Sequence, residues 1–308
     1  MTTEAMRLLD ELAAEGVSPW WAARPGEQPA VPEALSCGFR GVRMAAGTPV
    51  GVVRAACDEL RSCGGFVAFG AAAFDGADDP AAWVAAARML HSGVDRPNLL
   101  VGVPATPAGL TAVERCLAEG IGIEATSVFS VRQYRAVLDA QCAGLERARA
   151  RGVDLAAPGA ATSCDLGALD AAVNARLDRL GDDGAAGELR DTAGLATARL
   201  LYRTRETALA SKRWLSLRES GARPLMLLWS GLRPEQVRSL VSWNTGHVLS
   251  AETVEAAARG HGLEGDTLLG RHEQSVQALR LLAERGVDVE AVGAELLRAR
   301  SVSWSRAR

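Results

Sequence analysis

Two kinds of hydrophobic pattern alternate along this chain. Short apolar runs are separated by longer segments in which apolar residues recur every three or four positions, with charged residues between them. The first pattern is typical of buried strands and the second of amphipathic helices. Their repetition predicts parallel strand–helix–strand units. The eight predicted strands are Val17–Trp21, Phe39–Ala45, Phe66–Ala71, Leu99–Pro104, Ile121–Thr126, Ala157–Ser163, Leu225–Ser230 and Ser242–Leu249.

Local signals set the boundaries of several helices. Thr106 followed by Pro107 predicts a helix start, because a threonine side chain caps the first amides and proline suits the first turn. Ser130 and Gln133 form a capping-box pattern that opens a second helix. Residues 168–217 are predicted to form a long, mostly helical excursion between the sixth and seventh strands.

The number of units predicts the fold class. Eight strand–helix units in 308 residues match an α/β fold, the (β/α)8 TIM barrel, with extra N- and C-terminal helices, the last over Glu273–Arg298. No linker, low-complexity tract or short repeat divides the chain, so residues 1–308 are predicted to form one barrel domain. No apolar run approaches the roughly 20 residues of a membrane helix. Residues 1–16 form an acidic amphipathic helix rather than a signal peptide, so we expect a cytoplasmic protein.

Charge and composition narrow the classes of function. The net charge is −3 and the arginines are scattered, so we expect no nucleic-acid partner and no membrane partner. The six cysteines form no CxxC pair and the four histidines show no zinc spacing, so we expect free thiols, no metal site and no cofactor. Of 34 basic residues only Lys212 is a lysine. Arginine cannot replace a lysine amine that must lose its proton and attack a carbonyl.

Two neighbouring segments carry a family resemblance. Asp95–Leu110 reads DRPNLLVGVPATPAGL, and Ala118–Val137 reads AEGIGIEATSVFSVRQYRAV. Both resemble the transaldolase family, whose segments read DRPN, an apolar run, K-I-P-A-T and Gly-Leu, followed by EGI, N-x-T-x-I-F-S and QY-x-A. Weaker matches at Gly16–Trp20 and Gly221–Pro224 extend the resemblance over roughly residues 10 to 260. The resemblance implies a barrel with its pocket at the C-terminal ends of the strands.

The resemblance also places the family's functional residues, and four of them are changed here. They are the Schiff-base lysine, an aspartate that transfers protons, a glutamate that helps to activate water, and an arginine that binds phosphate. The matching positions are occupied, in the same order, by Gly102, Ala22, Gly70 and Ala168. Thr126 and Ser163 match a threonine and a serine of the family. The resemblance thus implies that the amine and the base of covalent aldol transfer are absent.

Polar residues expected near the strand ends form the candidate site. Glu124, Arg43 and His247 are the candidate catalytic groups, because a partly desolvated carboxylate or a histidine can transfer protons near neutral pH. The alternatives are an internal Glu124–Arg43 ion pair and a hydrogen-bonded structural histidine, and the sequence leaves them open. The candidate substrate-binding residues are Thr126, Ser163, Asp165, Arg233, Asn244 and Trp21.

Three functional hypotheses follow. The preferred one is a divergent enzyme repurposed for non-covalent acid–base chemistry on a small, sugar-derived or biosynthetic metabolite, as a lyase, isomerase, cyclase or transferase. The second is a non-catalytic pseudoenzyme that binds a metabolite or a protein, since decay also replaces catalytic residues by glycine and alanine. A true transaldolase with a relocated amine, Lys212, is the most remote. The expected partner is a small molecule, and a homodimer is one assembly that the sequence allows.

Overall fold

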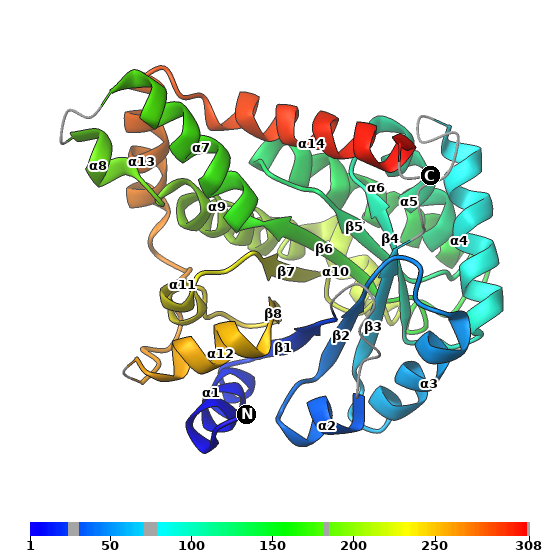
Figure 1. Ribbon diagram of the computed structural model, residues 1–308. Coiled ribbons are helices and arrows are strands. Elements are labelled where there is room, and N and C mark those ends of the chain that lie inside the picture. Colours follow the sequence, from blue (N-terminus) through cyan, green and yellow to red (C-terminus); the bar gives the residue numbers. More distant parts are fainter. Residues whose placement is uncertain (24–30, 71–78, 182–184, 261, 307–308) are drawn as a thin grey trace.

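The computed structural model contains eight parallel strands, which pair in chain order and close into a barrel. It describes residues 1–23, 31–70, 79–181, 185–260 and 262–306 (Figure 1). The strands are β1 (Val17–Ala22), β2 (Gly41–Met44), β3 (Phe66–Gly70), β4 (Leu99–Pro104), β5 (Ile123–Thr126), β6 (Ala160–Asp165), β7 (Met226–Ser230) and β8 (Thr245–Leu249). The barrel closes where β8 pairs with β1.

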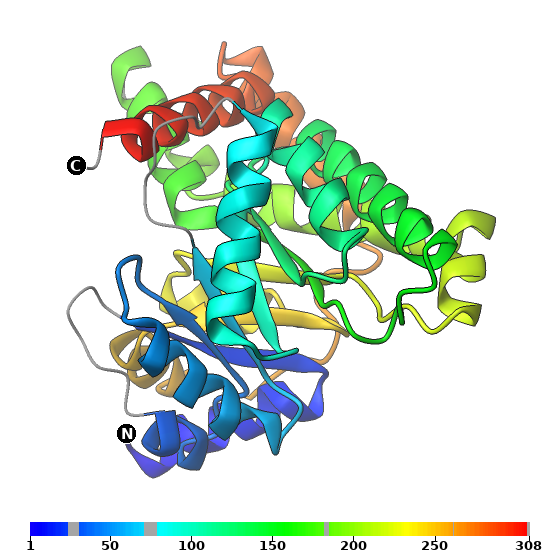
Figure 2. The same cartoon turned by 90° about the vertical axis from the view of Figure 1, so that its right-hand side faces the viewer.

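Helices surround the barrel, and at least one helix follows each strand (Figures 1 and 2). No helix in the described parts of the chain is long and apolar enough to cross a membrane. The helices are α1 (Thr3–Ala14), α2 (Val31–Ser36), α3 (Val50–Arg61), α4 (Pro80–Val94), α5 (Pro107–Leu117), α6 (Val131–Ala150), α7 (Leu166–Leu180), α8 (Ala185–Leu189), α9 (Ala193–Leu209), α10 (Lys212–Glu219), α11 (Pro234–Ser239), α12 (Ala251–Ala258), α13 (His272–Glu284) and α14 (Val289–Arg306).

The predicted barrel with extra terminal helices is confirmed, and so are the two predicted helix starts. The Thr106 hydroxyl accepts a hydrogen bond from the Gly109 amide at 3.0 Å, and the Ser130 hydroxyl accepts one from the Gln133 amide at 3.3 Å. One predicted helix is wrong in extent, because Glu273–Arg298 contains two helices. Gly286 interrupts it with a φ of 78°, a left-handed conformation that ends α13.

Strand boundaries differ from the prediction mainly at their N-terminal ends. β4 spans the predicted residues, whereas β8 begins at Thr245 rather than at Ser242. The predicted last residue of the third strand, Ala71, lies outside the described residues. Alternate residues of each strand face opposite sides of the sheet, so the strand side chains divide between an outer core under the helices and an inner core within the barrel.

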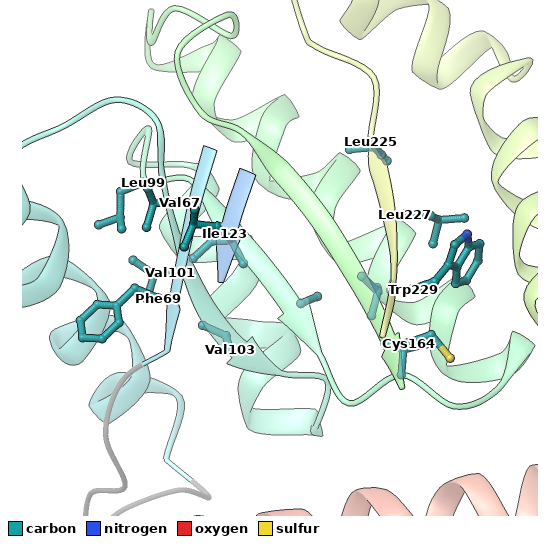
Figure 3. Close-up of a cluster of buried hydrophobic side chains, with 14 of the residues drawn as sticks. Val67, Phe69, Leu99, Val101, Val103, Ile123, Cys164, Leu225, Leu227 and Trp229 are labelled. Atoms are coloured by element: carbon teal, nitrogen blue, oxygen red, sulfur yellow. The ribbon is translucent and has the colours of Figure 1, made fainter. Parts of the chain in front are cut away.

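The outer core lies between the strands and the helices. Figure 3 shows Leu227 and Trp229 of β7 and Cys164 of β6 among the buried side chains of this core. The inner core fills the barrel itself. Its buried members are Trp20, Ala68, Leu100, Ala161, Leu228 and Val248.

Two inner glycines allow Trp20 to occupy the centre of the barrel. A Cβ at Gly41 would lie 2.4 Å from the Trp20 ring, and one at Gly246 would lie 2.5 Å from Leu228. Such distances are far shorter than van der Waals contact, so only glycine fits at these two positions. The packed inner core forms the floor beneath the C-terminal ends of the strands.

Candidate active site

Arg43 and Glu124 form an ion pair above this floor, between β2 and β5. The Glu124 side chain is 3% exposed and that of Arg43 is 26% exposed. Burial removes the carboxylate from water, and the guanidinium provides the opposite charge that such a group requires. The arrangement brings together two of the three predicted catalytic residues. It also matches the structural alternative raised for them, so their chemical role stays a prediction.

Two glycines leave the space between the paired residues open. Gly70 of β3 and Gly102 of β4 are in register with Glu124, and both strands lie between β2 and β5. A Cβ at Gly70 would meet no heavy atom within 4 Å. A Cβ at Gly102 would lie 3.2 Å from the Gly70 Cα and 3.7 Å from the Thr126 Cγ2. The strand ends therefore leave room above β3, next to a buried pair of charges.

Polar atoms around this space lack partners. The Arg43 Nε and the Thr126 Oγ1 are buried and make no hydrogen bond within the described parts of the chain. Buried polar atoms usually have partners, so unpaired ones beside open space are suited to a ligand. Ser163 is buried on β6, on the same face of its strand as the inner-core residue Ala161. Arg43, Glu124, Thr126 and Ser163 thus share the barrel interior.

The remaining changed family positions also lie near the barrel mouth. Ala22 ends β1 and packs against the inner core. Ala168 lies in the first turn of α7, where its amide donates to the Asp165 carboxylate at 2.9 Å. The C-terminal helix α14 reaches the same strand end, because Arg300 forms an ion pair with Asp165. Asp165 therefore already has two partners, a helix amide and a guanidinium. No local sequence pattern indicates Arg300 as a partner of this strand end.

His247 does not belong to this group, which corrects the expectation that it faces the pocket. Its neighbours in β8, Gly246 and Val248, contact the inner core, so the alternation points His247 outward. Its Nε2 lies 3.1 Å from the Leu240 carbonyl oxygen. Burial lowers the pKa of His247 to about 4, although the hydrogen bond to Leu240 opposes the shift.

Asn244 and Trp21 also lie elsewhere than expected. Asn244 precedes β8 at the N-terminal end of the barrel, where its side-chain amide donates to the Leu225 carbonyl at 3.3 Å. It adopts a φ of 53° there, a turn conformation that asparagine tolerates. Trp21 packs against the outer core and lines a cavity of about 240 Å³ together with Ala22, Glu33 and Glu252.

Arg233 is enclosed by carboxylates rather than open to an anion. Its guanidinium lies 3.1 Å from Asp170, 2.8 Å from Asp191 and 2.6 Å from Glu235. Partial burial lowers the pKa of Arg233, but the carboxylates outweigh this effect and leave the pKa raised. The buried Asp170 also accepts from the Gly194 amide at 2.7 Å. The cluster therefore joins α7, α9 and α11, and the expected anion contact at Arg233 is not supported.

Lys212 lies on the outside of the molecule. It is the first residue of α10, it is exposed, and α10 packs against α6 and α9 in the outer layer. The amine of Lys212 therefore lies outside the barrel interior. The six cysteines are free thiols, of which Cys63 is exposed.

Comparison with known proteins identifies the family. A family model described as Transaldolase/Fructose-6-phosphate aldolase matches residues 49–300. The chain belongs to the transaldolase family. A transaldolase of Acidothermus cellulolyticus is 37% identical over 224 residues, covering 70% of this chain and 60% of the relative. A transaldolase of Saccharopolyspora erythraea is 38% identical over 230 residues, covering 72% of this chain and 62% of the relative.

The chain thus spans about 60% of the length of these curated transaldolases. Among solved structures, 2,3-dimethylmalate lyase of the PEP mutase/isocitrate lyase superfamily gives a TM-score of 0.35 and 13% identity. That match covers 94% of this chain and all of the lyase, but at this score it identifies neither family nor function.

The comparisons correct the preferred functional hypothesis. Repurposing for other chemistry, and decay to a non-catalytic binder, were both inferred from the residues at four family positions. Relatives named transaldolase at 37% and 38% identity favour a transaldolase over either hypothesis. The family relationship thus favours the transaldolase part of the third hypothesis, which is the most remote on the sequence alone, and does not bear on Lys212.

Proposed function

We propose that this chain catalyses aldol-type transfer between sugars, as an enzyme of carbohydrate metabolism in the cytoplasm. Family membership and the relatives named transaldolase support the class of reaction. The observation that carries the placement is the buried Arg43–Glu124 pair beside open space at the strand ends. Active sites of TIM barrels lie at this end of the barrel.

In this proposal an open-chain ketose lies above Gly70 and Gly102. Glu124 accepts the proton of the hydroxyl next to the carbon–carbon bond that breaks, and the first product leaves as an aldehyde. The electron pair of the broken bond passes to the ketone oxygen of the retained fragment, where the Arg43 guanidinium stabilises the negative charge. An acceptor aldehyde then enters and the steps run in reverse, so that Glu124 returns the proton to the new hydroxyl.

The hydrogen-bonding capacity of the pocket fits a polyhydroxylated ligand. The Arg43 Nε–H donor has no partner in the described residues, and the Thr126 hydroxyl has none either. A sugar hydroxyl can both accept from the guanidinium and donate to, or accept from, the threonine. These two unpaired atoms, the Arg43 Nε and the Thr126 Oγ1, favour a ligand that carries hydroxyl groups. A ligand without such groups would leave both atoms without a hydrogen bond.

The position of Lys212 distinguishes this proposal from a mechanism in which the amine of Lys212 attacks the substrate. Lys212 is exposed on the outer helix α10, whereas Arg43 and Glu124 lie inside the barrel. Transfer at the strand ends is therefore expected to continue when Lys212 is replaced by methionine, which keeps an unbranched side chain without the amine.

Carbon-fragment exchange tests the proposal. The protein is incubated with fructose 6-phosphate and a series of aldose acceptors, and NMR detects new ketoses. We expect exchange with wild type and with Lys212→Met at similar rates. No new ketose with any donor–acceptor pair would contradict the proposed activity. Loss of exchange in Lys212→Met alone would contradict its placement at the strand ends.

A further inference from the structure

A second cavity lies in the outer helical layer, separate from the barrel interior. It has a volume of about 750 Å³, and its walls are faces of α6 and α9, with α10 and α13 at its two ends. This size falls within the about 300–1,000 Å³ typical of small-molecule sites. On α9 the lining residues Leu200, Arg203, Thr204, Thr207 and Ala208 recur at helical spacing, so one face of this helix borders the cavity.

The floor of this groove is apolar. Leu138 of α6 and Leu200 and Ala208 of α9 line it, and Val276 of α13 forms part of its edge. Val276 is 53% exposed, which is unusual for an apolar side chain beside other apolar side chains. Burying such a surface under a ligand is favourable by about 25 cal/mol for each Å² removed from water.

Arg135 of α6 and Arg203 of α9 line the groove and give it positive charge. Two further arginines flank the groove without lining it: Arg199, one turn before Arg203 on α9, and Arg271, which precedes α13 and makes no side-chain hydrogen bond to that helix. The Arg199 Nε is buried and has no hydrogen-bond partner among the described residues. Burial lowers the pKa of Arg199, and the positive charge of Arg271 lowers it further. These cations repel one another, and the start of α13 adds the positive end of a helix dipole.

Among the described residues that line the groove, Asp139 is the one carboxylate. It lies 3.3 Å from Arg213 of α10, at the end of the groove opposite α13. Arg213 also holds Glu146 at 2.8 Å. Glu273, in the first turn of α13, lies outside the lining residues, as Arg199 and Arg271 do. The groove therefore has an apolar floor and lining arginines, Arg135 and Arg203, beyond the pair formed by Arg213 and Asp139.

We propose that this groove binds a small amphipathic anion with one carboxylate group and an apolar body. The carboxylate lies between Arg203 and the start of α13, where guanidinium groups and free helix amides form charge-assisted hydrogen bonds. The apolar body lies along Leu138 and Leu200 and covers Val276. This site is independent of the proposed sugar chemistry, because none of its residues faces the barrel interior.

Decanoate is the probe that tests the proposal, with decanol as the uncharged control of similar length. Isothermal titration below the micelle-forming concentration of decanoate is expected to give one saturable site on the full chain. Arg203→Gln is expected to weaken binding about tenfold, because it removes a charge-assisted contact. Arg203→Lys, which keeps the charge but not the fork of donors, should lie between the two. Val276→Ser should weaken binding by a smaller factor.

Arg218→Gln provides the matched control, since Arg218 is an exposed arginine of α10 that does not line the groove. It should bind decanoate as wild type does, and all variants should melt at the wild-type temperature. Absence of saturable binding would overturn the proposal, as would equal affinities for decanoate and decanol or for wild type and Arg203→Gln. Binding of an acidic amphipathic helical peptide in the groove, with decanoate unbound, would replace the small anion by a protein partner.

Discussion

Arg43 of β2 and Glu124 of β5 form an ion pair across two intervening strands, which carry glycine at the level of the carboxylate. Side chains at Gly70 and Gly102 would stand beside the space that the pair borders. The lack of a side chain at these two positions therefore shapes the pocket as much as the two charged residues do. Together these four positions define a polar pocket above a packed apolar floor.

The first prediction concerns Glu124. Glu124→Gln keeps the size of the side chain and a hydrogen bond to Arg43 but removes the base, so fragment exchange should slow by about 10²–10⁴-fold. Initial rates measured by NMR at saturating donor check this. Glu119→Gln is the control, because Glu119 pairs with Arg88 on the surface and should leave the rate unchanged. Equal rates for Glu124→Gln and wild type would remove Glu124 from the mechanism.

A pair of glycine substitutions tests the open space. Gly70→Ala should change the free energy of unfolding by less than about 0.5 kcal/mol, because its Cβ meets no heavy atom within 4 Å. Gly41→Ala should destabilise the fold by about 1–3 kcal/mol, because its Cβ would lie 2.4 Å from the Trp20 ring. Urea denaturation measures both. Similar losses for the two variants would mean that the pocket is filled in solution.

His247 should make the free energy of unfolding depend on pH. Its pKa is lowered from 6.5 to about 4 in the folded protein, so the unfolded chain binds the extra proton between these values. The contribution is complete above pH 6.5, falls as the pH drops towards 4, and amounts to about 3 kcal/mol if the whole shift is realised. Urea denaturation at pH 7 and pH 4.5 should show a smaller loss in His247→Gln than in wild type. Identical losses would place the titration elsewhere.

Arg233 should matter for stability and not for the substrate. Arg233→Gln leaves the buried Asp170 with the amides of Gly194 and Gln236 but without its cation, so the free energy of unfolding should fall by about 1–3 kcal/mol. The Michaelis constant for a phosphorylated donor should stay within about twofold of wild type. A large rise in that constant with unchanged stability would restore Arg233 as an anion-binding residue.

Alternation of apolar runs and amphipathic segments predicted all eight strands, because each strand of a parallel barrel is buried on both faces. The face of the strand on which each side chain lies was harder to predict. Gly246 and Val248 flank His247 in β8, and glycine and valine are compatible with either face of a buried strand. Their residue types therefore did not show which face of β8 meets the inner core. The ion pair between Arg43 and Glu124 was predicted as an alternative to a catalytic role, because opposite charges on inward-facing strand positions attract each other.

Contacts between residues far apart in the chain account for most of what the sequence did not show. Arg233 meets Asp170 and Asp191 from 63 and 42 residues away, so the carboxylate cluster leaves no local pattern. The interruption at Gly286 was missed for a different reason, because the apolar spacing continues on both sides of the glycine. A positive φ at that one residue turns one long helix into two.

The ion pair between Arg300 and Asp165 has a consequence for biosynthesis. The two residues are 135 positions apart, and Asp165 ends the strand that carries Ser163. A ribosome must therefore translate past residue 300 before α14 can attach to that strand end. Until then the strands and the inner floor can assemble, but this side of the barrel mouth is still unfinished in the nascent protein. The contact between α14 and this strand end should thus form late, after the barrel itself has folded.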